Sequence, residues 1–236
     1  KTLVSTNLAA AVALSGSRNI TYMDCDVEEP NGHIFLKPKL YKTEAVNISV
    51  PVCDKEKCDY CGKCAEVCQF NAILAAKKMF LVFEEMCHGC GSCILVCPKR
   101  ALTEKKRKIG VVESGISVIK ENAQLAFSHG KLNIGEPMAP PIIKALKKHI
   151  NKEDLVILDA PPGTSCPVVE TIANSDFVVL VTEPTPFGLH DLKLAVDVVR
   201  KLDVPFGVVV NKSGIGNHDV NNFCDQEKIQ ILLSIP

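Results

Sequence analysis

The sequence predicts an α/β fold in which a parallel, doubly wound sheet carries a small inserted α+β domain. Two observations predict the sheet: its strands read as short, continuous apolar runs, and these runs alternate with segments of helical spacing. A third observation predicts the insertion, because eight of the 12 cysteines crowd into positions 58–97. With 236 residues, 47% of them hydrophobic, the chain can bury the core of one large domain or two modest ones.

The expected sheet is built from segments on both sides of the cysteine-rich region. Before it, residues 2–14 have helical spacing and residues 20–24 form a short strand that ends in acids. After it, three apolar strands alternate with helical segments, and polar residues gather at the strand ends, where parallel sheets bind ligands. The expected strands are 155–158, 177–181 and 206–210, and the expected helices are 142–149, 168–173 and 191–202.

The cysteine-rich region contains an internal repeat at a shift of 29 residues. Residues 54–73 align with residues 83–102, and each copy has the spacing C-x2-C-x2-C-x3-C. Bacterial 4Fe–4S proteins use this spacing, and the fourth cysteine of each run serves the other cluster. The predicted ligands of the first cluster are Cys58, Cys61, Cys64 and Cys97, and those of the second are Cys87, Cys90, Cys93 and Cys68.

Structural zinc and disulfides are the competing interpretations of these cysteines. Zinc sites take four ligands in two pairs, and a triplet followed by x3-C does not fit that scheme. A disulfide scaffold usually spreads its cysteines along a short chain, whereas here they are dense and local. The region resembles the dicluster bacterial ferredoxins. Pro98 follows the last cysteine of the second copy, Gln69 stands at that place in the first, and Cys53 lies outside the pattern.

Charge and hydropathy exclude several classes of protein. Lys plus Arg equals Asp plus Glu at 27 each, so no net field draws the chain toward nucleic acid or an anionic membrane. No apolar run reaches the roughly 18 residues that a membrane helix needs. No secretory leader is recognisable either. We therefore expect a cytoplasmic protein with no nucleic-acid partner and no membrane segment.

The flanking segments resemble the MinD/Mrp superfamily of P-loop ATPases with a deviant Walker A motif, in the subgroup with an inserted ferredoxin domain. The resemblance implies a P-loop ATPase domain over residues 1–50 and 107–236, and an inserted 2×4Fe-4S ferredoxin domain over residues 51–106. It also implies that the phosphate-loop glycines and signature lysine precede the first residue, and that a further element follows the last. The matching runs are KTLVSTNLA, DCDVEEPN, HGKLNIGEPMAPP, LDAPPGTSCPVVET, TEPTPFGLHDL and VVNKSG.

The resemblance implies roles for four residues in binding and hydrolysing Mg-ATP. Lys1 neutralises the β- and γ-phosphates, and the Thr2 hydroxyl ligates Mg2+. Asp26 is the switch I acid, which orients the attacking water or the bound Mg2+. Asp159 is the Walker B acid, which holds Mg2+ through water. The expected catalytic residues are thus Lys1, Asp26 and Asp159.

Three further residues follow the expected strands. Gly163 corresponds to the switch II glycine, whose amide senses the γ-phosphate. Asn211 corresponds to the residue that reads the adenine edge, although an Asn after a strand can also be a simple turn former. Cys166 lacks the partner cysteines that a bridging cluster needs, so we expect a structural thiol there.

The implied function is an ATPase that couples its nucleotide state to electron transfer through two 4Fe–4S clusters. The expected form is a homodimer with nucleotide at its interface and a redox or cluster-accepting protein partner. The alternative is a MinD/ParA-like switch or iron–sulfur assembly factor whose clusters are structural or cargo. A ligase similar to cobyrinic acid a,c-diamide synthase shares the fold, but the two expected domains leave no room for its substrate domain.

Overall fold

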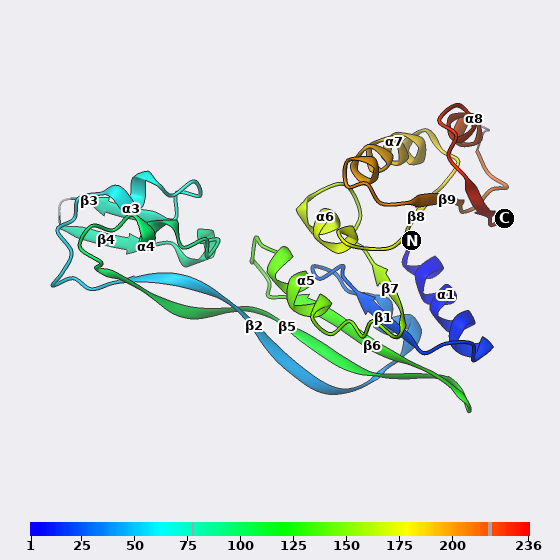
Figure 1. Ribbon diagram of the computed structural model, residues 1–236, viewed down its shortest axis with the longest axis horizontal. Helices are drawn as coiled ribbons and strands as arrows, with labels where there is room; N and C mark the ends of the chain where they lie inside the picture. The colour runs from blue at the N-terminus through cyan, green and yellow to red at the C-terminus, as the bar shows by residue number, and fades with distance from the viewer. Residues whose placement is uncertain (77, 217–218) are drawn as a thin grey trace.

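Two long strands join the two ends of an elongated molecule (Figure 1). The computed structural model describes residues 1–76, 78–216 and 219–236. Strands β2 (Lys39–Cys53) and β5 (Leu102–Lys120) pair antiparallel from Lys39↔Ile116 to Cys53↔Leu102. We call this pair the ribbon, residues 54–101 at its far end the lobe, and the remaining chain the body.

The main sheet of the body has the order β2-β5-β6-β1-β7. Strand β1 (Ile20–Asp24) is fully buried and lies parallel to both β6 (Ala123–Leu132) and β7 (Leu155–Asp159). The expected strands 20–24 and 155–158 are confirmed. The sheet is mixed, however, because β5 pairs antiparallel with both β2 and β6. Sequence analysis missed these three strands, since they alternate polar and apolar residues instead of forming continuous apolar runs.

A second sheet completes the body. Strands β8 (Val178–Thr182), β9 (Phe206–Val210) and β10 (Ile231–Ser234) are parallel and have the order β10-β9-β8. The strand expected at 206–210 is confirmed, and the one expected at 177–181 lies one residue further along. The doubly wound pattern of strands and helices is therefore present, divided between two sheets.

Helices cover these sheets. They are α1 (Thr2–Ser15), α2 (Gly32–Leu36), α5 (Pro140–Lys147), α6 (Cys166–Ile172), α7 (Pro186–Lys201) and α8 (Asp219–Gln226). Helix α7 begins five residues before the predicted start at 191, because the Thr185 side chain caps it by accepting from the Gly188 N–H at 3.0 Å, and Pro186 suits the first turn. None of the helices in the described part of the chain is long and apolar enough to cross a bilayer.

The lobe is small and has a repeated plan. It contains the short helices α3 (Lys63–Glu66) and α4 (Ser92–Leu95), and the hairpin of β3 (Ile73–Ala76) and β4 (Met79–Val82). The expected domain limits of 51 and 106 fall inside continuous strands β2 and β5. The ribbon thus replaces a flexible linker with a hydrogen-bonded ladder.

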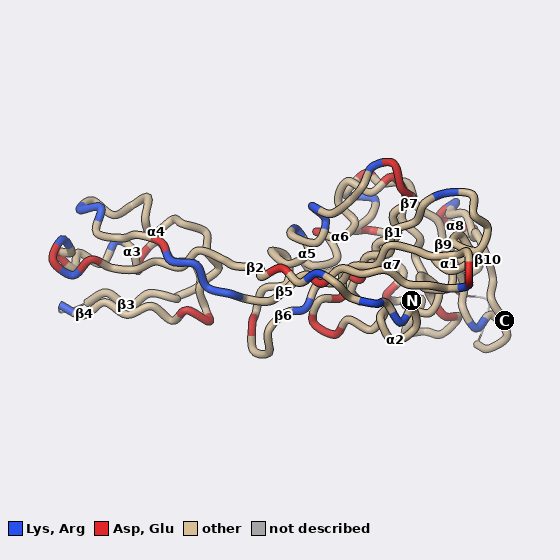
Figure 2. The backbone as a smooth tube through the Cα atoms, turned by 90° about the horizontal axis from the view of Figure 1, so that it is seen from below, with Lys and Arg blue, Asp and Glu red and all other residues tan. Residues whose placement is uncertain are grey.

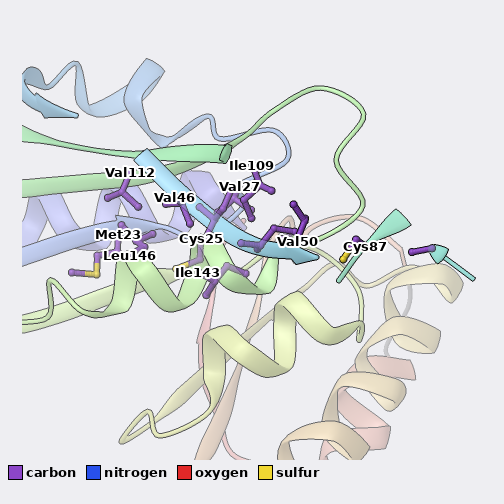
Figure 3. Packing of buried hydrophobic residues seen from close by; sticks show 14 residues of the cluster. Met23, Cys25, Val27, Val46, Val50, Cys87, Ile109, Val112, Ile143 and Leu146 are labelled. Atoms are coloured by element: carbon purple, nitrogen blue, oxygen red, sulfur yellow. The ribbon is translucent and has the colours of Figure 1, made fainter. Parts of the chain in front are cut away.

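One apolar cluster extends from the body along the ribbon to the lobe (Figure 3). Ile142, Ile143 and Leu146 of α5 are fully buried in it, and Val50 of β2 and Cys87 of the lobe belong to it too. Burial of apolar surface stabilises the fold by about 25 cal/mol per Å2. The lobe end of the ribbon is therefore packed into the same core that supports the main sheet.

This packing predicts different costs for two Ile→Ala substitutions. Ile142 has 0% exposure in this cluster, whereas Ile134 lies fully exposed in the loop after β6. Ile142→Ala should lower the free energy of unfolding by about 2–5 kcal/mol, because it leaves a cavity and loses apolar burial. Ile134→Ala should change it by less than about 0.5 kcal/mol. Urea denaturation of both variants checks this, and equal effects would contradict the described core.

Candidate functional site

The acids that end two neighbouring strands meet at the carboxyl edge of the main sheet. Asp24 ends β1 and Asp159 ends β7, and the two residues are register partners. Both are buried, with 0% and 2% exposure. Each charge needs partners there, because burial of an unpaired carboxylate is costly.

Lys1 and Tyr22 partner the carboxylate of Asp159. The Lys1 Nζ lies 3.4 Å from Asp159 Oδ1 and also donates to the carbonyl of Ala160. The Tyr22 hydroxyl donates to Asp159 Oδ2 at 2.8 Å. Sequence analysis missed Tyr22, although it faces the same side of β1 as Asp24 and a buried tyrosine hydroxyl usually has a partner. The lysine and acid expected to bind Mg-ATP are thus side by side.

Asp24 organises the loop that follows β1. Its Oδ1 accepts from the Asp26 N–H at 3.1 Å, and its Oδ2 accepts from the N–H groups of Asn31 at 2.9 Å and Gly32 at 2.7 Å. Burial raises the pKa of Asp24 to about 6, although these three donors act in the opposite direction. The carboxylate therefore ties the start of α2 to the end of β1.

The other predicted nucleotide residues lie around this edge. Partial burial raises the pKa of Asp26, and the nearby Lys1 cation opposes that shift. Thr2 is the first residue of α1, directly after Lys1. Gly163 follows β7 with φ at +87° and open space where a side chain would start. Their roles toward a nucleotide remain predictions.

Asn211 stands at the end of β9, in the second sheet. Its N–H donates to the Thr182 carbonyl at 2.8 Å, and its side chain contacts Glu183. Glu183 also pairs with Lys212 at 2.8 Å. These contacts fit a turn at the end of a strand. Among the described hydrogen bonds, none joins Asn211 to another residue predicted to bind nucleotide.

In the lobe, the eight repeat cysteines separate into two sets, each lining one cavity. We call them the first cavity and the second cavity, in the order of the repeat copies that supply three of their four cysteines. The first is lined by Cys58, Cys61, Cys64 and Cys97, and the second by Cys68, Cys87, Cys90 and Cys93. Each set contains three cysteines of one copy and the fourth of the other.

The backbone around both cavities follows the 29-residue repeat. Gly62 and Gly91 have φ of +82° and +74° and lie directly before α3 and α4 as their N-caps. Two further pairs at the same shift, Tyr60 with Gly89 and Asn71 with Arg100, also have positive φ. At this shift the N–H groups of Ala72 and Ala101 each point at a cysteine sulfur, Cys68 and Cys97 respectively, at 3.3 Å.

These features fit a cubane in each cavity. A 4Fe–4S cluster needs four thiolates around one space and N–H donors to sulfur, and both are present. The ring of His88, next to Cys87, lines the second cavity. No His, Cys, Asp or Glu side chains in the described part of the chain are grouped to hold a single metal ion. The ligand assignments remain predictions.

Sequence analysis gave Cys53 no role, but the structure packs it beside the first cysteine set. Burial raises the pKa of Cys53 to about 12, and a side-chain hydrogen bond with Cys58 raises this pKa further. Its apolar surroundings include Cys64 and Cys97. Only the antiparallel pairing of Cys53 with Leu102 across the ribbon could have placed it there, and sequence analysis did not predict that pairing.

The lobe matches a known family. The model of the family described as "4Fe-4S binding domain" matches residues 54–74 and 80–103, and these two ranges span the two copies of the repeat. The chain therefore has two segments of the ferredoxin type, and each spans one copy of the repeat.

The body resembles solved P-loop ATPases. One is the septum site-determining protein MinD complexed with Mg-ADP from Pyrococcus horikoshii. The alignment covers 100% of this chain and 75% of that one, with 16% identity and a TM-score of 0.51. Another is a ParA family ATPase from Chlorobium tepidum. The alignment covers 100% of this chain and 77% of that one, with 11% identity and a TM-score of 0.55. At these identities the likeness shows the fold.

Two curated relatives come from Methanocaldococcus jannaschii. Uncharacterized protein MJ0578 is 35% identical over 92% of this chain and 75% of its own length. Uncharacterized protein MJ0579 is 32% identical over 83% of this chain and 70% of its own length. The chain therefore belongs to the family of MJ0578 and MJ0579, and it combines a MinD/ParA-type P-loop ATPase fold with an inserted ferredoxin region.

Proposed function

We propose that this protein binds and hydrolyses Mg-ATP, holds two 4Fe–4S clusters in the lobe, and couples its nucleotide state to electron transfer through them. We include in the proposal a homodimer with nucleotide at its interface and a protein redox partner. Support comes from the ATPase fold, the paired Lys1 and Asp159, and the two cysteine-lined cavities.

The observation that carries the coupling is the continuous path of helix and strand from Asp24 to the lobe. Asp24 holds the N–H groups of Asn31 and Gly32, where α2 begins. Helix α2 ends at Leu36, and β2 starts at Lys39 and continues to Cys53 beside the first cysteine set. A change in the loop after β1 therefore displaces the strand that holds the lobe.

The residues of the body have distinct tasks in this proposal. Lys1 offers its ammonium group to the phosphates of ATP, and Asp159 orients Mg2+ while Tyr22 fixes its carboxylate. Asp26 orients the attacking water. When bound, the clusters supply one-electron storage at low potential. The cysteines bind them as thiolates, and the N–H groups of Ala72 and Ala101 stabilise the charge on sulfur.

Removing one predicted ligand should remove one cluster. Cys61→Ser should lower the iron content of anaerobically reconstituted protein from about eight to about four atoms per chain. Cys166→Ser is the matched control, because Cys166 is also exposed but lies in α6 of the body. Iron analysis and the visible absorbance of both variants check this. Unchanged iron in Cys61→Ser, or no iron in the native protein, would contradict cluster ligation.

Asp159→Asn should slow MgATP hydrolysis by about 10- to 100-fold, because it weakens the hold on Mg2+. The control Asp203→Asn removes a carboxylate from an exposed turn with positive φ, which Asn also accepts, and should keep the native rate.

We also expect the rate of the native protein to differ between oxidised and reduced clusters. A phosphate-release assay in both redox states measures all three rates, and an identical native rate in both states would count against the coupling.

A further inference from the structure

The two cavities differ in their walls despite the repeat that builds them. At the 29-residue shift, Phe70 and His88 of the second cavity correspond to Lys99 and Asp59 of the first. Phe70 and His88 stack with ring centroids 3.5 Å apart and planes 7° from parallel. An aromatic pair thus lines the second cavity at these places, and two charged residues line the first, whose wall also includes Tyr60 and Phe80.

The remaining charges in the walls increase this difference. The first cavity is also lined by Lys63, which with Lys99 and Asp59 gives a net charge of +1 from these three side chains. The second is lined by the carboxylate of Glu104, by the imidazole of His88 and by no Lys or Arg among its wall residues in the described part of the chain, so these side chains contribute a net charge of 0 at most.

Charges just outside the second cavity do not cancel this contrast. Arg107 acts on Cys87 electrostatically, but both of its terminal nitrogens pair with the carboxylate of Glu136. Lys105 pairs with Glu84 at 2.6 Å. Figure 2 shows this basic segment of β5 at the point where the ribbon meets the lobe. A hydroxyl of Ser92 lies 3.5 Å from the sulfur of Cys90, and this neutral group has a smaller effect than a full charge.

These differences act on cluster reduction in one direction. A [4Fe–4S]2+ core with four thiolates has a total charge of 2−, and uptake of one electron from an external donor gives 3− with no proton transferred. Cations and water stabilise the added negative charge, whereas an apolar cover and a carboxylate oppose it. The walls of the first cavity therefore favour reduction more than those of the second.

We propose that the two cluster sites are non-equivalent, and that the cluster of the first cavity has the higher reduction potential because of Lys63 and Lys99. This inference rests on the proposed cluster ligation. The first electron then settles in the first cavity. The second cavity is lined by Ser49 and Pro51 of β2, so the harder-to-reduce cluster lies against the ribbon that leads to the body.

The repeat supplies the variants for a test by EPR-monitored redox titration of the reconstituted full-length protein. Lys99→Gln should lower the higher midpoint and leave the lower one in place. We expect about a threefold loss in the reduction equilibrium, or about 28 mV for one electron, because Lys99 is exposed and screened by solvent. Phe70→Lys places the residue of the first cavity in the second and should raise the lower midpoint.

Lys201→Gln is the control, because Lys201 is exposed on α7 of the body, and neither midpoint should change. Two coincident native midpoints would overturn the inference. A response of the lower midpoint to Lys99→Gln would also overturn it, while leaving cluster ligation intact. Absence of both cluster signals in iron-reconstituted native protein would instead overturn the proposed function together with this inference.

Discussion

The antiparallel pairing of β2 with β5 is the interaction on which the rest of the structure depends. The ladder runs from Lys39↔Ile116 to Cys53↔Leu102, and at about 3.3 Å per residue the 15 residues of β2 extend by about 50 Å. An isolated two-stranded ribbon is marginally stable in water. Here one end is held by β6 and α5, and the other end closes the lobe beside Cys53.

The ribbon also explains how one chain can hold two chemistries apart yet connected. Figure 1 shows the lobe well away from β1 and β7, the strands that end in Asp24 and Asp159. In the proposed function, this separation keeps the cysteine thiolates away from the bound nucleotide. The chain itself is the connection, since the Asp24 carboxylate accepts from the N–H of Gly32, where α2 begins, and β2 follows α2. A strand in a continuous ladder transmits a displacement that a flexible linker would absorb.

Sequence alone predicted the parts whose signal is local. The continuous apolar runs gave β1, β7 and β9, and the cysteine spacing gave two sets that each line one cavity. The strands β2, β5 and β6 were not predicted, because they alternate polar and apolar residues instead of forming continuous apolar runs. The hydrogen bond from the Tyr22 hydroxyl to Asp159 was missed for a different reason, since 137 residues separate the two side chains.

A redox titration of the full-length protein, purified without oxygen and followed by EPR with and without MgATP, tests the coupling most directly. The account predicts two cubane signals and a midpoint shift on addition of MgATP for at least one of them, because β2 lines the second cavity with Ser49 and Pro51 and ends at Cys53 beside the first cysteine set. By linkage, the free energy that corresponds to this midpoint shift equals the change in the binding free energy of MgATP when the cluster is reduced. Two cubane signals with midpoints that MgATP leaves unchanged would contradict the coupling.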